Sequence, residues 1–509
     1  MVHRGQGDAC APSSRSAIPE AEKKTARPLL DEIENIFIDC HGAFDQERCW
    51  LRWQRLVLST LVSLSRRTVT GLITTSGQQF CDWSADYRLL AQGRIDPDAL
   101  FGVLQRGILD DLPADQPLVA AIDDTVSQKK GRKVPGTAWR RDPMSPPFQA
   151  NLVWGRRFIQ LSAVVPSREE QAPGRAIPID FVHAPTPKRP PRSADEQTWA
   201  HYRQMSREHA LARQGAQRIA QLRSSMDEKG AWYRQLWMVG DGSYTNGTIL
   251  RGLPRATTFV GRVRSDAQLH GMPPQRVKGE RGRVRRYGTT TLTPDQVRTD
   301  ESIPWQTTPV FAAGSVHEMR YKSVGPLLWR PAGADRLLRL IVIAPLAYRL
   351  TRHSKLLYRN PAFLICTDSK ASPAAILKAY VSRWDIEVNI RDEKQLLGLD
   401  EAQVRNEVSS KIAPALAVVS YSVALLAASR AFGVNGSPMS LPRPKWRAHA
   451  PRPRASTADI LNHLRFELWG QAISPPHYSG FASSNSPTPK PQNCYPHFAD
   501  TLFYAQPRA

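Results

Sequence analysis

The sequence predicts an α/β fold: a mixed β-sheet flanked by helices, with an N-terminal helical lobe and a β-rich insertion before the last helix of the sheet domain. Three observations support this prediction. Apolar residues recur at three- and four-residue steps through 29–112, as in amphipathic helices. Short apolar strands alternate with helical segments from Leu118 onward. Residues 264–335 are basic and rich in Gly, Pro and Thr, without a helical pattern.

The N-terminal part divides into a polar leader and a helical lobe. Residues 1–28 lack the apolar core of a secretory signal, and we expect them to be disordered. Residues 29–112 form the lobe, and the polar stretch 65–70 follows one helical run and could open a second helix. A DNA-binding module and a purely structural lobe both fit this pattern.

The sheet domain is predicted in two parts, 113–263 and 336–432, separated by the insertion at 264–335. In the first part we expect strands at 118–122, 150–165 (a pair split at Gly155), 176–182, 236–239 and 257–263, and one long helix at 196–233. In the second part we expect strands at 337–347 and 362–366 and a helix at 372–397. Two acidic positions follow strands of the first part, and a third acid lies on the last helix.

The C-terminal region is predicted to contain a buried helix and then a tail. The apolar run Ile412–Ser429 includes Pro414 and several hydroxyl side chains, which favours a buried core helix over a membrane span. Residues 433–509 are rich in Pro, Arg and Ser, and we expect a mostly disordered tail in which only 458–468 is helical.

The charge of the chain indicates a polyanionic partner. Lys plus Arg is 69 and Asp plus Glu is 46, so the net charge is +23. Nucleic acid is the first candidate and an anionic membrane surface the second, and the basic residues occur in patches that suit DNA better. Six cysteines without a C-x-x-C pair give no zinc motif and fit a reducing compartment, so we expect a cytoplasmic protein.

One face of the helix predicted at 372–397 gathers a carboxylate, cations and a phenol. At about 100° per residue, Tyr380, Arg383, Glu387 and Lys394 fall within roughly 60° of one another, and Arg391 joins them. Three further acids point away from this face: Asp385, Asp392 and Glu393. A single carboxylate among phosphate-binding groups is typical of a metal-dependent enzyme acting on nucleic acid.

Three carboxylates stand at positions suited to a metal site. Asp124 follows the first strand, Asp241 follows a later strand, and Glu387 lies on the last helix. Phosphodiester cleavage needs both the attacking and the leaving oxygen stabilised, which two Mg²⁺ ions held by a few carboxylates accomplish. Asp123 is an alternative to Asp124, because strand alternation lets only one of these two side chains point inward.

The spacing Y-x2-R-x3-E-x6-K from Tyr380 to Lys394 resembles the third acidic motif of bacterial insertion-sequence transposases of the DDE superfamily. Asp123-Asp124-Thr125 resembles the first motif of that superfamily, in which the carboxylate before Thr binds metal, so this resemblance prefers Asp124. The stretch 239–244, an Asp after an apolar strand and then an aromatic residue, resembles the second motif. The resemblance covers roughly 115–430 and implies an RNase H-like core.

The resemblance also implies an activity and assigns roles to residues. A DNA transposase would cut the ends of its element and join the freed 3′-OH to target DNA, as a homodimer holding both ends of the double-stranded element. Arg383 and Lys394 would hold phosphates, with Tyr380 beside them. Lys129 and Lys130 directly follow the first acidic motif and would add affinity for DNA.

Further expectations concern the insertion and the rival functions. Trp305 and Trp329 lie where members of the superfamily stack a flipped base, and the sequence does not choose between them. A nuclease or resolvase on the same core that only hydrolyses DNA is one rival. A DNA-binding or regulatory derivative without catalysis is the other.

Overall fold

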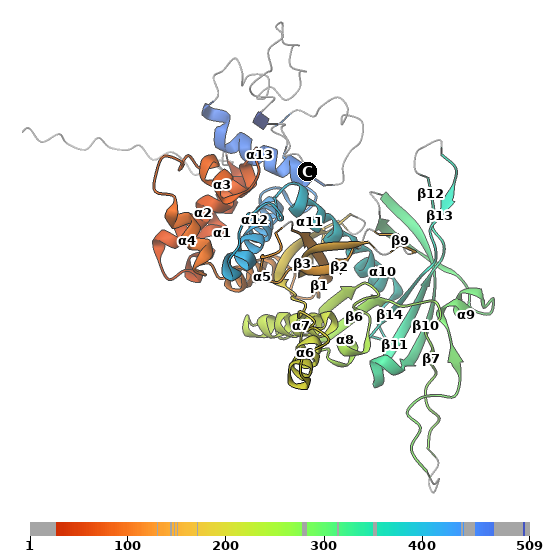
Figure 1. The fold of residues 1–509 in the computed structure, drawn as a ribbon. Helices are drawn as coiled ribbons and strands as arrows, with labels where there is room; N and C mark the ends of the chain where they lie inside the picture. Colours follow the sequence, from red (N-terminus) through yellow and green to blue (C-terminus); the bar gives the residue numbers. More distant parts are fainter. Residues whose placement is uncertain are drawn as a thin grey trace, which may run out of the picture.

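The computed structural model describes the chain from residue 27 to the helix near the C-terminus, with short gaps. The described residues are 27–129, 131–142, 145–146, 148–149, 151–169, 172–276, 282–312, 315–349, 354–438, 441, 454–472 and 502–503. Figure 1 shows a helical lobe on one side of a long twisted sheet that continues into a β-rich extension on the other side. Residues 1–26 of the N-terminus predicted to be disordered lie outside the described residues, and its last residue, Pro28, begins a helix.

The N-terminal lobe is helical, as predicted. Its elements are α1 Pro28–Asp39, η1 His41–Ala43, α2 Glu47–Val62, α3 Val69–Thr75, α4 Ser84–Ala91 and α5 Pro97–Asp111. The predicted second helix near residue 65 begins at Val69, because the Thr68 side chain accepts a hydrogen bond from the backbone N–H of Gly71. The apolar faces of these helices surround Trp53, which is fully buried.

Five strands form the centre of the sheet, in the order β4, β3, β1, β5, β6. Their bounds are β1 Leu118–Gln128, β3 Leu152–Val165, β4 Arg175–His183, β5 Leu236–Gly240 and β6 Thr257–Arg262. The first three pair antiparallel, whereas β5 runs parallel to β1 and β6 parallel to β5. This arrangement confirms the predicted α/β, RNase H-like fold.

The β-rich insertion is present and extends the same sheet. Beyond β6 the order continues through β14, β11 and β10 to β7 and β8, with β9 also on β10 and β2 at the opposite edge, giving 12 strands. The bounds are β2 Ala138–Arg141, β7 Leu269–His270, β8 Thr291–Leu292, β9 Gln306–Ala312, β10 Ser315–Trp329, η2 Arg330–Ala332, β11 Gly333–Ile343 and β14 Ala362–Cys366; a separate hairpin pairs β12 Ala347–Tyr348 with β13 Leu357–Tyr358. The insertion also holds a helix absent from the prediction, α9 Pro294–Thr299, which the Thr293–Gln296 capping box starts.

Two helices predicted as continuous are each divided. The predicted helix 196–233 consists of α6 Glu196–Glu208 and α7 Leu211–Glu228, and the predicted helix 372–397 consists of α10 Pro373–Ser382 and α11 Trp384–Gln395. The predicted strand pair at 150–165 is instead the single strand β3, which β2 accompanies. The short helix α8 Gly247–Arg251 connects β5 to β6.

A long apolar helix, α12 Glu407–Phe432, lies between the N-terminal lobe and the sheet (Figure 1). It is long and apolar enough to cross a membrane, but 94% of its most apolar window is buried inside the protein. The predicted buried core helix is therefore confirmed. Its Ser422 hydroxyl donates to the carbonyl of Pro178 in β4 at 2.7 Å, which ties α12 to the sheet.

The C-terminal helix belongs to the folded body. α13 Thr457–Trp469, followed by η4 Gly470–Ala472, packs on α1, α2 and α12. The carboxylate of Glu467 accepts the backbone N–H groups of Leu29 (3.1 Å) and Leu30 (2.7 Å) at the start of α1. The helix predicted at 458–468 is thus present as α13, and buried contacts join it to the lobe.

Candidate active site

The two neighbouring aspartates of β1 point to opposite faces of the sheet. Asp123 lies opposite Gln160 of β3, on the face that α11 covers, since Gln160 donates to Glu393 of that helix at 2.9 Å. Asp124 lies opposite Ile159, on the face that α7 covers. The choice between Asp123 and Asp124 as a metal ligand is therefore a choice between the two faces of the sheet.

Asp123 and Glu387 share one arginine. Arg383, at the break between α10 and α11, places Nη1 3.4 Å from Asp123 Oδ2 and Nη2 2.7 Å from Glu387 Oε1. The Arg383 side chain is only 12% exposed, so these ion pairs lie largely out of solvent. The guanidinium thereby brings a carboxylate of the first strand and the carboxylate of the signature helix to one place.

Asp124 is engaged by other groups. The Tyr244 hydroxyl donates to its Oδ1 at 3.2 Å, and Arg157 Nε lies 3.3 Å from its Oδ2. Tyr244 reaches this position because α7 carries Gly215 beside its ring, where an added Cβ would come within 2.9 Å of the ring. The sequence reading did not include Tyr244 or Arg157 in the site, although Tyr244 is the aromatic residue of the second motif.

Asp241 begins a tight turn after β5. Its Oδ1 accepts the backbone N–H groups of Ser243 (2.8 Å) and Tyr244 (3.3 Å), which fixes the carboxylate at the end of the strand. β5 runs beside β1 with Gly240 opposite Ile122, so Asp241 lies next to the aspartates of β1. We call Asp123, Asp124, Asp241 and Glu387 the acidic site.

The charges of the acidic site are coupled. Burial raises the pKa of Asp123 to about 7, and the neighbouring carboxylates of Asp241 and Asp124 act in the same direction against the effect of Arg383. Burial and the Asp241 carboxylate also raise the pKa of Asp124, which Arg157 opposes. Burial thus disfavours the ionised form of both aspartates, and a bound cation would favour that form.

The donor set fits a hard divalent cation in its chemistry, because all four groups offer carboxylate oxygens. Among the described residues, however, no three His, Cys, Asp or Glu side chains are already close enough together to hold an ion. Arg383 lies between Asp123 and Glu387. An ion bound by both carboxylates requires this guanidinium to move.

The other predicted residues of the signature helix divide into two groups. Tyr380 and Lys394 lie by the site: the ring of Tyr380 is 6.0 Å from the Arg383 guanidinium, and Lys394 Nζ donates to the carbonyl of Val126 in β1 at 2.9 Å. Arg391 instead donates to Asp392, its neighbour in sequence, and is more than half exposed.

The acids predicted to point away from the signature face do so. Asp385 pairs with Arg454, Asp392 accepts from Thr457, and Glu393 accepts from Gln160. The division at Arg383 leaves Tyr380 on α10 and Glu387 and Lys394 on α11, whereas Arg391 of the predicted face pairs with Asp392.

The basic residues after β1 are only partly described. Lys129 Nζ donates to the carbonyl of Asp400 at 2.7 Å, and burial lowers the pKa of this ammonium group. It fastens the end of β1 to the chain after α11. Lys130 lies outside the described residues.

The two candidate tryptophans of the insertion are both partly buried against the main core. The ring of Trp305 lies 4.8 Å from Lys322 Nζ and 5.4 Å from the guanidinium of Arg320, so cations pack on it. Trp329 ends β10 and pairs with β7. Neither ring is singled out as a platform for a base.

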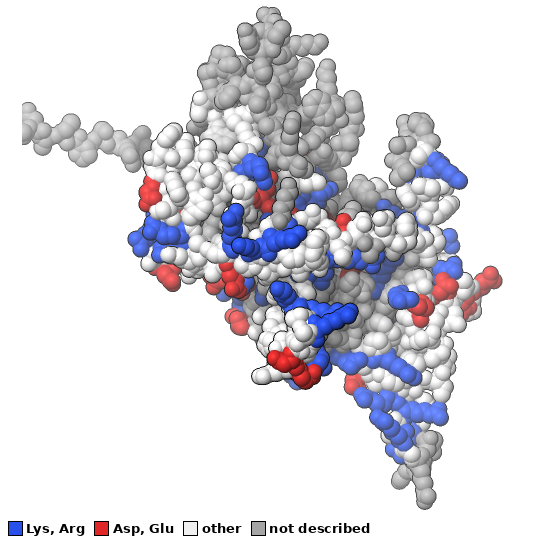
Figure 2. Space-filling view, viewed as in Figure 1, with Lys and Arg blue, Asp and Glu red and all other residues white. Residues whose placement is uncertain are grey.

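Basic side chains gather on the outer surface of the insertion. Figure 2 shows Lys and Arg along the arm that β7 and β8 begin. Arg283 and Arg285 are exposed there and form no ion pair within the described part of the chain, whereas Arg286 pairs with Asp335 at 3.2 Å. The unpaired guanidinium groups of Arg283 and Arg285 present positive charge that suits a nucleic acid backbone.

β1 continues to Gln128, so Asp123 and Asp124 lie within this strand and not after it. An RNase H-like sheet with carboxylates on β1, after β5 and on α11 carries the acidic groups typical of metal-dependent nucleases. Residues 39–310, more than half of the chain, match the family described as DDE superfamily endonuclease, and the chain belongs to this family. The match includes Asp123, Asp124 and Asp241 and ends before Glu387. No curated protein matches the chain. Nucleases of this superfamily act on DNA and generally use divalent metal ions.

Proposed function

We propose that this protein is the DNA transposase of a bacterial insertion sequence, which cuts the ends of its element and transfers the freed 3′-OH to target DNA. The observation that carries the proposal is Arg383, which brings Glu387 of the Y-x2-R-x3-E-x6-K helix together with Asp123 of β1. Membership of the DDE superfamily supplies the nuclease activity, and the signature helix favours a transposase within it.

We assign the metal site to Asp123, Asp241 and Glu387. The resemblance preferred Asp124, but Asp124 faces α7 and is engaged by Tyr244 and Arg157. Asp123 instead shares its face with Glu387. Asp124 then has an indirect role. It accepts a hydrogen bond from the Tyr244 hydroxyl, and the backbone N–H of Tyr244 in turn donates to Asp241. Two Mg²⁺ ions bound there would activate a water or a 3′-OH and neutralise the leaving oxygen.

The cationic side chains position the DNA. Once Arg383 leaves the carboxylates, its planar guanidinium can hold a phosphate by two parallel hydrogen bonds, and Lys394 can supply a point charge beside it. The Tyr380 ring, 6.0 Å from the Arg383 guanidinium, would then lie beside the same phosphate. The exposed arm with Arg283 and Arg285 adds affinity that does not depend on sequence.

The assembly follows from the reaction. Both ends of the element must be cut and joined to the target in one complex, so we propose that the protein acts on double-stranded DNA as a homodimer or larger assembly. We place this complex at the bacterial nucleoid in the cytoplasm. A core that only hydrolyses DNA is the alternative function, and joined products distinguish the two.

The test uses the purified full chain with Mg²⁺ and two labelled DNAs, one carrying uncut ends of the element and one carrying ends already cut to expose the 3′-OH. We expect joining of these ends to a supercoiled plasmid by the wild type and its loss in Glu387→Gln. Glu407→Gln is the control, because this exposed glutamate pairs with Lys411 within α12 and not with a residue of α11. Cleavage of uncut ends without any joining would assign the hydrolytic alternative. Binding of the ends without either reaction would contradict both.

A further inference from the structure

The orientation of α11 is not set by the preceding helix alone. α10 stops at Ser382 and α11 starts anew at Trp384, without a side-chain hydrogen bond at its N-cap residue Arg383. Glu387 lies in the first turn of α11, the part of a helix that is least restrained by its own hydrogen bonds. Besides the ion pair of Glu387 with Arg383, contacts on the remaining surface of α11 therefore help to set the position of Glu387.

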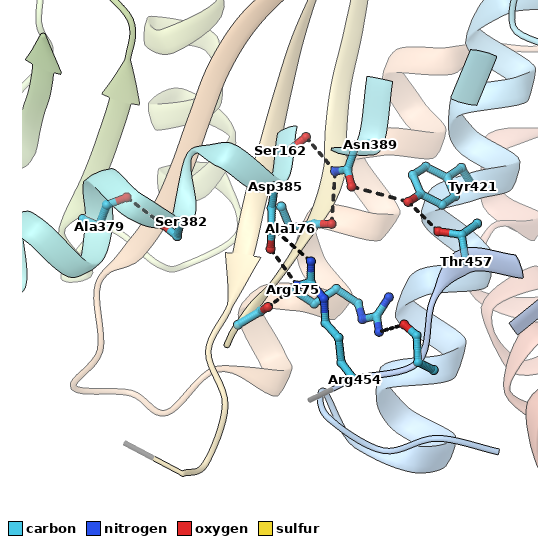
Figure 3. A network of polar contacts seen from close by, with 12 residues as sticks. Ser162, Arg175, Ala176, Ala379, Ser382, Asp385, Asn389, Tyr421, Arg454 and Thr457 are labelled. Atoms are coloured by element: carbon cyan, nitrogen blue, oxygen red, sulfur yellow. Dashed lines mark hydrogen bonds and ion pairs between the residues drawn. The ribbon is translucent and has the colours of Figure 1, made fainter. Parts of the chain in front are cut away.

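The first such contact comes from the C-terminal segment. Arg454 donates to both oxygens of Asp385 at 2.7 Å each, from Nη1 to Oδ2 and from Nη2 to Oδ1 (Figure 3). The two side chains are 21% and 20% exposed, so the pair is largely shielded from water. Parallel hydrogen bonds of this kind fix the relative orientation of two groups as well as their distance.

Arg454 is itself held in place by the sheet. Its Nη1 also donates to the carbonyl of Gly174, directly before β4. The neighbouring Arg175, which is buried, donates in return to the carbonyl of Ala455 at 2.8 Å. Reciprocal hydrogen bonds thus fasten the segment at 454–455 to the start of β4, so Arg454 forms a rigid link from the sheet to α11.

A second contact lies further along the same side of α11. Thr457 Oγ1 donates to Asp392 Oδ2 at 2.6 Å and lies 3.0 Å from the hydroxyl of Tyr421 in α12. The Tyr421 hydroxyl donates in turn to Asn389 at 3.5 Å, and Asn389 donates to the carbonyl of Ala176 at 3.1 Å (Figure 3). All these groups are buried. The network holds the middle of α11 as Arg454 holds its beginning.

The contacted side of α11 is the side that faces away from the proposed reaction. Asp385 precedes Glu387 by two residues, which separates their directions on the helix by roughly 200°. A contact there places α11 without entering the acidic site. None of the three motifs includes Arg454, because it follows Asp385 by 69 residues and lies in a stretch of Pro, Arg and Ser.

We propose that Arg454 is a positioning residue for Glu387: it holds the first turn of α11 against β4 and so sets the place of the catalytic carboxylate. The proposal rests on the proposed function for its effect on catalysis. The orientation of α11 that it explains does not depend on the reaction, and the two parts can be measured separately.

The test compares Arg454→Ala with Arg430→Ala in the full chain. Arg430 forms a similar ion pair with Asp111, at 2.8 and 3.4 Å, but it joins α12 to α5 away from α11. Hydrogen exchange measured by mass spectrometry reports the opening of α11 without any need for activity. Cleavage of labelled end DNA in Mg²⁺ reports kcat and KM.

We expect the amides of α11 to exchange about tenfold faster in Arg454→Ala than in the wild type and to stay unchanged in Arg430→Ala. The kcat of Arg454→Ala should fall about a hundredfold with KM within about twofold, since a small misplacement of a catalytic group affects the chemical step. The double variant Asp385→Arg with Arg454→Asp, which reverses the ion pair, should recover part of the protection of the α11 amides and part of the kcat.

Two results would overturn the proposal. One is equal exchange of α11 in the two alanine variants. The other is a kcat of Arg454→Ala no lower than that of Arg430→Ala. If the wild type neither cleaves nor joins DNA, the proposed function fails, and the exchange rates alone then decide whether Arg454 positions α11.

Discussion

At the scale of single residues, the composition of the proposed metal site depends on which of the adjacent residues Asp123 and Asp124 faces α11. Strand alternation predicts that Asp123 and Asp124 point to opposite faces, but it does not say which face the last helix covers. That depends on how α11 packs against β1 and β4, a contact between segments more than 200 residues apart. The identity of the β1 ligand was therefore left open by the sequence, and the geometry favours Asp123.

The two aspartates give a matched pair of variants. We expect Asp123→Asn to reduce the rate of end cleavage by about a thousandfold or more, because it removes a ligand of the proposed metal site. Asp124→Asn keeps a side chain that can accept the Tyr244 hydroxyl and should lose about tenfold or less. Single-turnover cleavage in Mg²⁺ measures both. The reverse order of the two effects would return the role of ligand to Asp124.

A second residue predicts a dependence of stability on pH. Burial raises the pKa of Glu393 to about 8, although Gln160 donates a hydrogen bond to it. The folded chain thus binds this proton more tightly than the unfolded chain, so its stabilising contribution is full below the ordinary glutamate pKa and is lost as the pH rises toward 8. Glu393→Gln removes the charge at nearly constant shape.

We therefore expect Glu393→Gln to raise the thermal midpoint more at pH 8.5 than at pH 5, as seen by calorimetry at both values. The comparison variant is Glu407→Gln, an exposed glutamate, which should shift the midpoint equally at the two values. A gain for Glu393→Gln that is independent of pH would show that its carboxyl is not protonated in the folded chain.

At the scale of elements, the sequence predicted most helices and strands but not their interruptions. The break between α6 and α7 falls at Ala210, which adopts an extended ψ of 132°, and the break at Arg383 keeps helical angles. Neither position carries Gly or Pro, the residues that signal a break locally. A pattern of apolar residues at three- and four-residue steps does not by itself mark such a break.

A further prediction at this scale concerns how α13 stabilises the start of α1. Its Glu467 accepts the first backbone N–H groups of α1 and also contacts His463 Nε2 at 2.7 Å, and all of these groups are buried. Glu467→Ala leaves buried donors without a partner, so the free energy of unfolding should fall by about 1–3 kcal/mol. Urea unfolding measures the loss. Glu407→Ala should leave the midpoint unchanged, and an equal midpoint for both variants would mean that the tail does not secure the lobe.

At the scale of the whole molecule, the order of elements along the chain predicted the central five strands because neighbouring motifs of this fold are close in sequence. The extension of the sheet was not predictable in the same way. β14 pairs with β6 after about a hundred intervening residues, and β7 and β8 pair with neighbours across the basic arm. Such pairings depend on which strand edges of the central sheet remain unpaired, and a local sequence pattern does not show which edges these are.

The charge of the whole molecule predicts how DNA binding responds to salt. With a net charge of +23 and an exposed basic arm, the affinity for end DNA should fall linearly in a plot of log K against log salt. The double variant Arg283→Ala with Arg285→Ala should reduce that slope by about two, one for each phosphate contact. Fluorescence anisotropy over a salt series measures it, with Arg430→Ala as control. An unchanged slope would exclude the arm from the DNA interface.

The most direct test of the central claim is to locate the metal. Crystals of the full chain with end DNA, grown with Mn²⁺ in place of Mg²⁺, would show the ions by anomalous scattering. We predict density among Asp123, Asp241 and Glu387, with the Arg383 guanidinium turned from those carboxylates to a DNA phosphate. Ions bound by Asp124 on the α7 face, or DNA bound with no ion at Glu387, would contradict the account.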